Sequence, residues 1–410
     1  MRLSRFLPLL CLIPSFAGAD EAPRKWTDTT GRSFEGSYVS ATDAKVTIKR
    51  ADGKVFEVER ARLSKDDQDY LATAAKSAPA TSAPTAAKPQ FIPGDYRAQM
   101  LAGYEGTSPN FNAPWPKDAG IDKEPEITTV EENAGEKRFI YESPHFRFES
   151  NVVLRPSLVA KVAMMFEACY QTHHDLPFNN RRTRSPKAPK LRAYLFETMA
   201  EYHTAGGPSG SSGVYMGGED KFLVPLEGLG VKKVGSGYMF DYSGNFHTVY
   251  HEITHQLWAD LGDYAGIWMI EGFAEFVASA PYSNGKFSFI KQPSYALEYA
   301  TGFGKKDEGG RGLGKEFSMP HLEQIMNWSQ PQFYQNGNKN YGLGMLLVYY
   351  FILLDGDGTG AKFKDCIKAS QEGKSREEAL KVLLSGRSYA DLEKEVSTAF
   401  KKKGIKISFE

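Results

Sequence analysis

The sequence has little cysteine, little histidine and no excess of charge of either sign. Among 410 residues there are 3 cysteines and 8 histidines, and Lys+Arg and Asp+Glu both number 50. This balance removes any general argument for nucleic acid or an anionic membrane surface as a partner. No apolar run is long enough to span a bilayer, so no transmembrane anchor is expected. Hydrophobic residues at 41% are an ordinary globular share, and the length predicts two domains.

The cysteines form no metal-binding framework. Cys11 falls in an N-terminal apolar run, which leaves Cys169 and Cys366 in separate helix-like stretches. Their spacing matches no zinc ribbon, so a cysteine–zinc site is excluded. In an exported protein these two residues can form one disulfide or stay buried as free thiols, and the sequence leaves both open.

The N-terminus has the three parts of a secretory signal peptide. Arg2 and Arg5 precede the apolar run of residues 6–13, and Ala17-Gly18-Ala19 supplies small residues for cleavage. The pattern predicts a signal peptide over residues 1–19, with cleavage after Ala19. The mature protein is therefore expected to be secreted or periplasmic.

Residues 20–75 are predicted to form a small β domain. Short segments with period-two alternation begin at Trp26, Asp52-Gly53 marks a two-residue hairpin turn, and Ser64 caps a short closing helix. The Trp-Thr-Asp opening, the Asp-Gly hairpin and the Leu-Ser start of the helix together resemble the Sla-homology type of Src-homology-3-like barrel. This resemblance implies a small β-barrel that binds peptide or cell-envelope material. A role as a spacer has equal weight.

The rest of the chain predicts an α+β protein. Residues 76–93 are rich in Ala, Pro and Ser and read as a linker, whereas residues 94–136 read as an irregular lead-in. A second domain over residues 137–410 is expected to hold a mixed β-sheet and then a largely helical C-terminal half. Its predicted elements are strands at 139–141, 145–149, 191–196, 213–215 and 222–224, a helix at 156–170, and helices beyond residue 245.

The second domain contains the pattern His251-Glu252-x-x-His255. On a helix, residues four apart lie one above the other, so the two imidazoles converge on one point. Glu252 follows His251 directly, which lets its carboxylate approach a metal-bound water instead of the metal. Two unrelated surface histidines are the alternative interpretation.

A second segment, Trp268-Met269-Ile270-Glu271-Gly272-Phe273-Ala274-Glu275, follows on the next apolar stretch. Catalytic zinc takes three protein ligands and leaves a fourth position open. Glu271 is the predicted third ligand, because the 15 residues after His255 let the chain turn back. Glu275 lies four residues further on the same face, where it is predicted to accept a hydrogen bond from a ligand imidazole and fix its tautomer.

Together these two segments resemble the gluzincin metallopeptidases, which include the alanyl and leucyl aminopeptidases. The resemblance implies a zincin-like catalytic domain in which His251, His255 and Glu271 bind Zn²⁺. It also implies that Glu252 is the general base and that peptide or protein is the substrate. The spacer between the segments is shorter than in the aminopeptidases, so the chain resembles a relative of that group.

Two further residues follow from the same resemblance. The segment Asn340-Tyr341-Gly342 is similar to the one that supplies the aminopeptidases with an oxyanion-stabilising tyrosine, so Tyr341 is a candidate for that role and a core tyrosine is the alternative. Glu219 lies where those enzymes bind the substrate amino group, but their motif is not reproduced. Exopeptidase and endopeptidase activity both stay open.

The remaining histidines carry less information. His247, one turn before His251, is expected to line the cleft, whereas the others lack ligand spacing and are expected to be structural. These are His145, His173, His174, His203 and His321.

Two other functions compete with the peptidase. The second domain could be another zinc hydrolase, or a metal-binding protein without turnover. Alternatively, the chain is chiefly an envelope-binding adaptor that acts through its N-terminal barrel.

Overall fold

The computed structural model describes residues 24–29, 32–41, 45–49, 55–68, 70–71, 109–178, 190–217, 219–258, 265–302 and 310–410. The chain divides into two compact units, residues 1–90 and 91–410. The predicted signal peptide, the linker and the Asp52-Gly53 turn lie outside the described residues. No helix among the described residues has both the length and the apolar character needed to cross a membrane.

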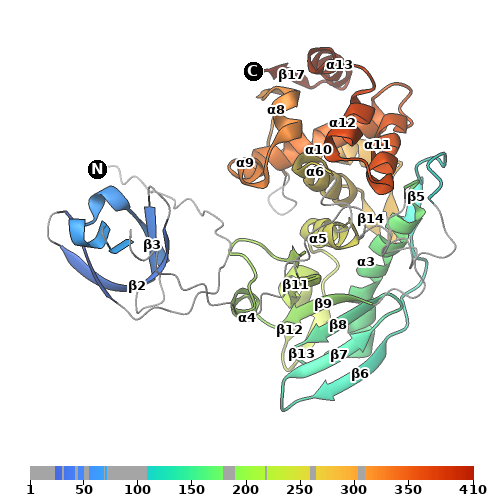
Figure 1. The fold of residues 1–410 in the computed structure, drawn as a ribbon. Helices are drawn as coiled ribbons and strands as arrows, with labels where there is room; N and C mark the ends of the chain where they lie inside the picture. Colours follow the sequence, from blue (N-terminus) through green and yellow to red (C-terminus); the bar gives the residue numbers. More distant parts are fainter. Residues whose placement is uncertain are drawn as a thin grey trace, which may run out of the picture. The chain divides into compact units, whose positions relative to one another are not determined.

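The first unit is a four-stranded antiparallel sheet in the order β1-β2-β3-β4 (Figure 1). Among the described residues the first strand makes no further strand pairing on its other side, and only a single bridge joins Asp28 to Leu63. The described strands therefore do not form the closed barrel that was expected. The elements are β1 (Arg24–Thr27), β2 (Ser33–Ala41), β3 (Lys45–Lys49), β4 (Val55–Glu59) and the 3-10 helix η1 (Arg60–Arg62).

Trp26 is the centre of this unit. Its ring is fully buried and its indole N–H donates to the Gly36 carbonyl oxygen at 2.9 Å. The Arg24 guanidinium lies between the rings of Trp26 and Tyr70, at 4.7 and 3.6 Å from their centroids. Arg24 also pairs with Asp67 at 2.7 Å, so a cation–π contact and an ion pair join the first strand to the closing helix.

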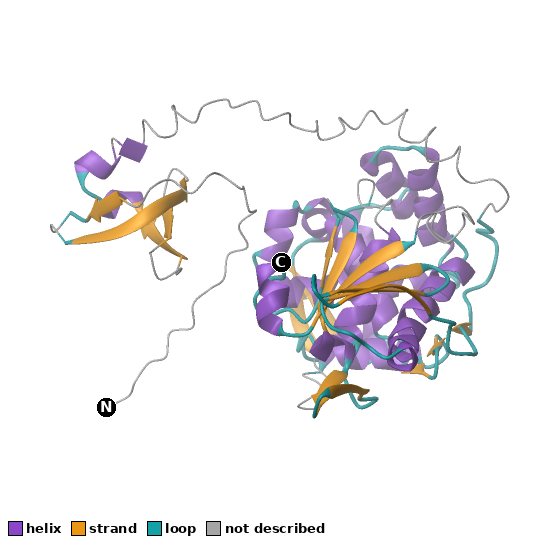
Figure 2. Cartoon of the chain, turned by 90° about the horizontal axis from the view of Figure 1, so that it is seen from below, coloured by secondary structure: helices purple, strands orange, loops and turns teal. Residues whose placement is uncertain are grey.

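The second unit is built on a six-stranded mixed sheet, as the alternating segments predicted. Its order is β10-β11-β9-β8-β7-β6, with parallel pairings only between β8, β9 and β11. In Figure 2 its strands run side by side among the helices. The elements up to residue 240 are β5 (Asp118–Gly120), β6 (Thr128–Asn133), β7 (Arg138–Glu142), β8 (Phe146–Ser150), α3 (Pro156–Asp175), β9 (Leu191–Phe196), α4 (Met199–Thr204), β10 (Val214–Met216), β11 (Lys221–Pro225), η3 (Leu226–Leu229), β12 (Val231–Val234) and β13 (Gly237–Phe240).

The described part of the lead-in, residues 109–136, is less irregular than was expected for residues 94–136. β6 lies inside it and pairs with β7 at the sheet edge, and β5 pairs with β15. The strand was missed because β6 reads Thr-Thr-Val-Glu-Glu-Asn, an edge sequence in which no side chain is buried. β6 contributes no buried side chain of its own, but it pairs with β7, which places Ile140 and Tyr141 in the core.

Two helices pack on the sheet and position the site. α3 begins with Pro156 at its first turn and buries Leu158, Val162 and Phe166 at helical spacing, so its apolar face covers the central strands. α5 (His247–Trp258) packs beside α3 and against β10 and β11. Its buried Val249, Ile253 and Leu257 belong to the same cluster.

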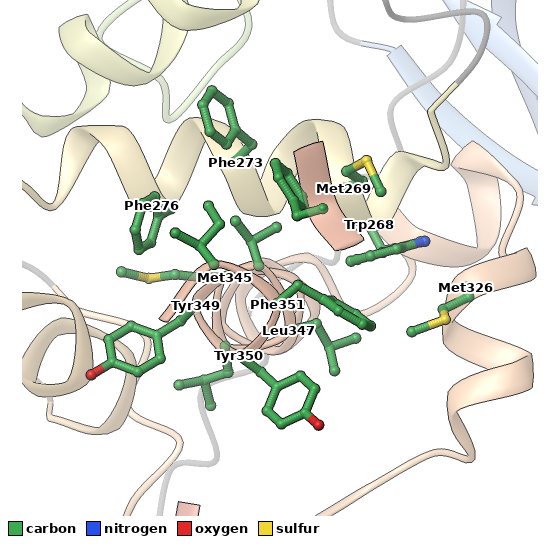
Figure 3. Close-up of a cluster of buried hydrophobic side chains, with 14 of the residues drawn as sticks. Trp268, Met269, Phe273, Phe276, Met326, Met345, Leu347, Tyr349, Tyr350 and Phe351 are labelled. Carbon is green, nitrogen blue, oxygen red and sulfur yellow. The ribbon is translucent and has the colours of Figure 1, made fainter. Parts of the chain in front are cut away.

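The C-terminal half is largely helical, in agreement with the sequence. A second core lies around α6 and α10, with Trp268, Phe273 and Phe276 of one helix facing Met345 and Tyr349 of the other (Figure 3). The elements are α6 (Ile267–Ala278), β14 (Tyr282–Ser283), β15 (Lys286–Ser288), α7 (Gln292–Thr301), β16 (Glu316–Met319), α8 (Leu322–Asn327), α9 (Gln330–Tyr334), α10 (Gly337–Leu353), α11 (Ala361–Glu372), α12 (Arg376–Leu384), α13 (Tyr389–Lys401) and β17 (Lys406–Phe409).

Two glycines let α6 and α10 approach closely. A Cβ atom at Gly272 would lie 2.3 Å from the Gly344 carbonyl oxygen, and one at Gly344 would lie 2.7 Å from the Trp268 carbonyl oxygen. Any larger residue at either position would push the helices apart. This contact holds the N-terminal turns of α10, and Tyr341 with them, beside the helix that carries Glu271.

Cys169 and Cys366 are both buried free thiols. Cys169 lies in the α3 cluster and Cys366 in the α10 cluster, so the disulfide alternative is excluded in this structure. Burial raises the pKa of both thiols, as expected for structural cysteines.

Candidate metal centre

The two histidines of the His-Glu-x-x-His pattern converge from one face of α5. His251 Nε2 and His255 Nε2 lie 2.9 Å apart, with their rings nearly perpendicular at 82°. The four-residue spacing sets the two side chains one above the other. His251 is buried and His255 is partly buried, so the pair lies at the margin of the core.

Glu271 reaches the same point from α6. Its Oε2 atom lies 3.2 Å from His251 Nε2 and 3.0 Å from His255 Nε2. Burial opposes its charge, but the two imidazoles outweigh this and lower the pKa of Glu271. Three potential ligand atoms from two helices therefore meet in one place, as the sequence predicted for this trio.

The donor set fits a zinc ion. Tetrahedral zinc binds imidazole nitrogen and carboxylate oxygen at about 2.0–2.1 Å, which sets neighbouring ligand atoms about 3.3 Å apart. The three separations of 2.9 to 3.2 Å are close to that value. Two imidazoles and one carboxylate leave a fourth position open, which distinguishes catalytic from structural zinc sites.

Glu275 supports His251 from the other side of its ring. Glu275 Oε1 lies 2.8 Å from His251 Nδ1, and its predicted role in fixing the tautomer of a ligand stays a prediction. Burial by itself would lower the pKa of His251, but Glu271 and Glu275 together raise it to about 10. The ring is therefore held by a carboxylate at each nitrogen.

Arg311 compensates the charge of Glu275, which is completely buried. Its Nε and Nη2 atoms donate to the two carboxylate oxygens at 2.8 and 2.6 Å. The guanidinium also lies 4.7 Å from the ring centroid of Tyr341, and its Nη1 donates to Asn338 at 3.1 Å. Arg311 thus ties Glu275 to the start of α10.

His247, Glu275 and His251 form a second group with ligand atoms close together. His247 Nε2 lies 3.4 Å from Glu275 Oε1, and its ring stacks on Tyr299 at 4.1 Å. Burial is the main reason that the pKa of His247 is lowered. Because Arg311 already occupies both oxygens of Glu275, this group is an ion-pair network and a poorer metal site than the first.

Glu252 is oriented by the edge of the sheet. Its Oε2 atom accepts a hydrogen bond from the Tyr215 backbone N–H of β10 at 2.8 Å. Burial raises the pKa of this carboxylate, although His255 and His251 oppose the rise. A partly buried carboxylate with a raised pKa beside two imidazoles has the properties of a general base.

Tyr341 lies beside the cluster, with its ring centroid 5.6 Å from that of His251. Burial is the main cause that raises its pKa, so the hydroxyl keeps its proton and can donate. The sequence did not single out Tyr334 of α9, whose hydroxyl donates to Glu271 Oε1 at 2.5 Å. Glu271 therefore has one oxygen directed at the histidines and the other held by a tyrosine.

Glu219 is not brought to the cluster by any described contact. It lies in the turn between β10 and β11, pairs with Lys221 at 2.5 Å and has a side chain that is 57% exposed. Its backbone oxygen accepts from Arg192 at 2.7 Å. Both of these contacts are with residues near the sheet edge, and the predicted role of Glu219 in holding a substrate amine stays a prediction.

The other histidines belong to neither group of potential ligands. His145 pairs with buried Glu167 at 2.6 Å, and His321 with Glu393 at 3.1 Å. His173 is buried beside Thr254, with its Nε2 atom 3.3 Å from the hydroxyl. His203 Nδ1 lies 2.9 Å from the Gly207 carbonyl oxygen. Each of these has a partner of the kind that structural histidines use.

Tyr334, Arg311 and Tyr299 are the neighbours that sequence reasoning missed. Each comes from a segment far from α5 in the chain, and none belongs to a motif. The one available signal was at Arg311, a lone cation in the glycine-rich stretch Gly309-Gly310-Arg311-Gly312. A side chain isolated among glycines often reaches a buried partner, but nothing in the stretch identifies Glu275 as that partner.

Comparison with known proteins identifies one part of the chain. Residues 18–78 match the family model described as SLA1 homology domain 1, SHD1. This agrees with the Sla-homology resemblance of residues 20–75. A search among curated proteins found no match. The matched segment includes no residue of the candidate metal centre.

Proposed function

We propose that this protein is a zinc-dependent peptidase whose second unit is a zincin-like catalytic domain of the gluzincin type. The observation that carries the proposal is the convergence of His251 Nε2, His255 Nε2 and Glu271 Oε2 to within 3.2 Å of one another. In this proposal the three residues hold the ion and Glu275 orients His251. The sequence resemblance and the geometry both support it.

A zinc ion at this point would acidify a water molecule and polarise a carbonyl group. Glu252 takes the proton of the attacking water and later donates it to the leaving amine. Its raised pKa suits a group that must hold a proton for part of the cycle. Tyr341 donates its hydroxyl hydrogen to the developing oxyanion, a role for which its burial keeps it protonated.

The edge strand β10 supports a peptide as the substrate. β10 ends the order of the described sheet, so its outer edge has no neighbouring strand there. The N–H of Tyr215 points away from β11, because it donates to Glu252. In an extended strand the carbonyl of the same residue points the same way. An extended peptide that added to this edge would pass directly beside Glu252.

The proposal is tested by metal analysis combined with peptide cleavage. Purified protein should contain one zinc per chain and cut peptides from a mixed library, and a chelator should abolish cleavage. Glu252→Gln should keep the zinc and lower the rate by about 10²- to 10⁴-fold. Glu316→Gln is the matched control, because that glutamate has a side chain that is 74% exposed. A Glu252→Gln protein with the parent rate would overturn the assignment.

The first unit has a separate proposed role. The match to the Sla-homology family model supports a small binding module of the Src-homology-3-like type, directed at peptide or cell-envelope material. With the predicted signal peptide, this makes the protein a secreted or periplasmic peptidase that is placed near its target. Deleting residues 20–90 should leave hydrolysis intact and abolish localisation. Loss of hydrolysis would contradict this separation of roles.

A further inference from the structure

A large open cavity lies next to the proposed active site. Its volume is about 1120 Å³, and its lining includes His247 and Tyr299. His247 is one turn from His251 on α5, and their ring centroids lie 6.5 Å apart. A residue of an extended peptide spans about 3.3 Å, so a substrate at the cluster would reach this cavity within two or three residues.

The walls of the cavity are aromatic and acidic. Within the described part of the chain its lining combines aromatic rings with three carboxylates, and Lys161 is the one lysine or arginine in it. The faces of aromatic rings carry negative electrostatic potential, so rings and carboxylates together favour a cation. The carboxylates are Asp122, Glu124 and Glu298, and the rings are those of Phe240, Tyr242, Phe246, Tyr250, Tyr282, Tyr295 and Tyr299.

One wall already holds a cation between a carboxylate and a tyrosine hydroxyl. Lys161 Nζ of α3 lies 3.6 Å from a Glu124 carboxylate oxygen and 5.1 Å from the ring centroid of Tyr242. The side-chain contact with Tyr242 is the main cause that raises the pKa of Lys161. The ammonium group is therefore held by a carboxylate oxygen and by the tyrosine hydroxyl, to which it donates a hydrogen bond.

A second tyrosine and carboxylate of the lining, Tyr295 and Glu298, lie on α7. Tyr295 and Glu298 are three residues apart, so their side chains are neighbours on the helix surface. Tyr295 is 52% exposed. Among the described residues no cation pairs with Glu298 or lies over the Tyr295 ring. The third carboxylate of the lining, Asp122, is already paired with Lys286 at 3.2 Å.

We propose that the cavity is a specificity site that receives a basic side chain of the peptide substrate, seated between Glu298 and Tyr295. This inference rests on the peptidase function proposed above and adds its substrate class. The protein should prefer peptides with arginine or lysine a few residues from the scissile bond. A neutral apolar residue or a sugar is the competing occupant.

The test measures binding separately from hydrolysis. Full-length Glu252→Gln protein is titrated with fluorescent peptides that carry arginine or its neutral isostere citrulline at one position each. At the best position arginine should bind about five- to tenfold more tightly than citrulline. High salt should shrink this ratio. Adding Tyr295→Ala and Glu298→Gln should bring the ratio close to one, whereas Glu377→Gln, a 78% exposed glutamate on α12, should leave it unchanged.

The outcomes separate this proposal from the peptidase itself. Equal binding of arginine and citrulline peptides at every position would overturn it, as would a preference that survives both α7 substitutions. Tighter binding of neutral aromatic peptides or glycans would replace it with the competing occupant. If active protein binds arginine peptides selectively but cuts none, the cavity assignment stands and the proposed hydrolysis fails.

Discussion

Glu271 and Glu275 lie one turn apart on α6, are both buried and both approach His251, yet their surroundings differ. Glu271 faces two imidazole nitrogens and the Tyr334 hydroxyl, whereas Glu275 faces His251, His247 and the fork of Arg311. Each belongs to a group that could hold a metal. A guanidinium already satisfies one carboxylate, and only the other is left to bind a cation. The two residues are of the same type, so the presence or absence of the Arg311 guanidinium distinguishes the proposed ligand, Glu271, from the residue that supports His251, Glu275.

The same contrast extends to the buried imidazoles. His251 lies between two carboxylates and its pKa is raised to about 10, in spite of its burial. His173 on α3 is equally buried, but its neighbours are the Thr254 hydroxyl and the Phe273 ring. Burial lowers the pKa of His173 to about 3. Desolvation dominates where no carboxylate opposes it.

The largest effect is expected when the carboxylate of Glu271 or of Glu275 is replaced by an amide, which tests their different roles. Glu271→Gln should abolish stoichiometric zinc binding, because it removes a ligand charge. Glu275→Gln should weaken binding by about 10- to 100-fold, as expected for a group that orients a ligand. Zinc affinity is measured by competition with a chromophoric chelator. Equal losses in both variants would contradict the division of roles.

Arg311 tests the charge compensation of Glu275. Arg311→Met leaves a buried carboxylate with only histidine partners, so the free energy of unfolding should fall by about 3–5 kcal/mol. The double variant Arg311→Met/Glu275→Gln removes both charges and should recover part of that loss. Urea unfolding of the two single variants and the double one closes the cycle. Additive losses would show that the pair is not coupled.

Substitutions of Tyr341 and Tyr334 are expected to have different effects on kcat and on zinc affinity. Tyr341→Phe should lower kcat by about 10²-fold with little change in zinc affinity, because an oxyanion donor acts in the transition state. Tyr334→Phe removes only the hydrogen bond to Glu271 Oε1 and should weaken zinc binding by a few-fold. If Tyr334→Phe shows the larger fall in kcat, the oxyanion role belongs to Tyr334.

The smallest predicted effect concerns His173 and pH. Its folded pKa lies below the unfolded value, so the unfolded chain binds the extra proton and stability falls as pH drops below about 6.5. The slope is up to about 1.4 kcal/mol per pH unit. His173→Gln should remove this contribution between pH 7 and 5, measured by urea unfolding with a chelator present. His174→Gln, whose side chain is 43% exposed, should keep the parent slope, and a parent slope in His173→Gln would contradict the assignment.

Several elements could be predicted from sequence because their signals are local. The strand pair β10–β11, the helix α3 and the helix α5 follow from alternation or helical spacing within a few residues. β6 was missed because its sequence is polar and its partner strand defines it. The closed form of the N-terminal barrel was expected, whereas the described strands form an open four-stranded sheet.

By itself, the sequence determined the two imidazoles of α5 and the glutamates of α6, because residues four apart on a helix share a face in any fold. It also determined the small β module, through a recognisable series of short strands. Only the tertiary structure decided which carboxylate contacts both imidazole Nε2 atoms and which is bound by Arg311. It also decided that Tyr334, Tyr341 and an acidic aromatic cavity lie beside the cluster. Those contacts join segments tens of residues apart, and the packing of α6 against α10 through Gly272 and Gly344 brings them together.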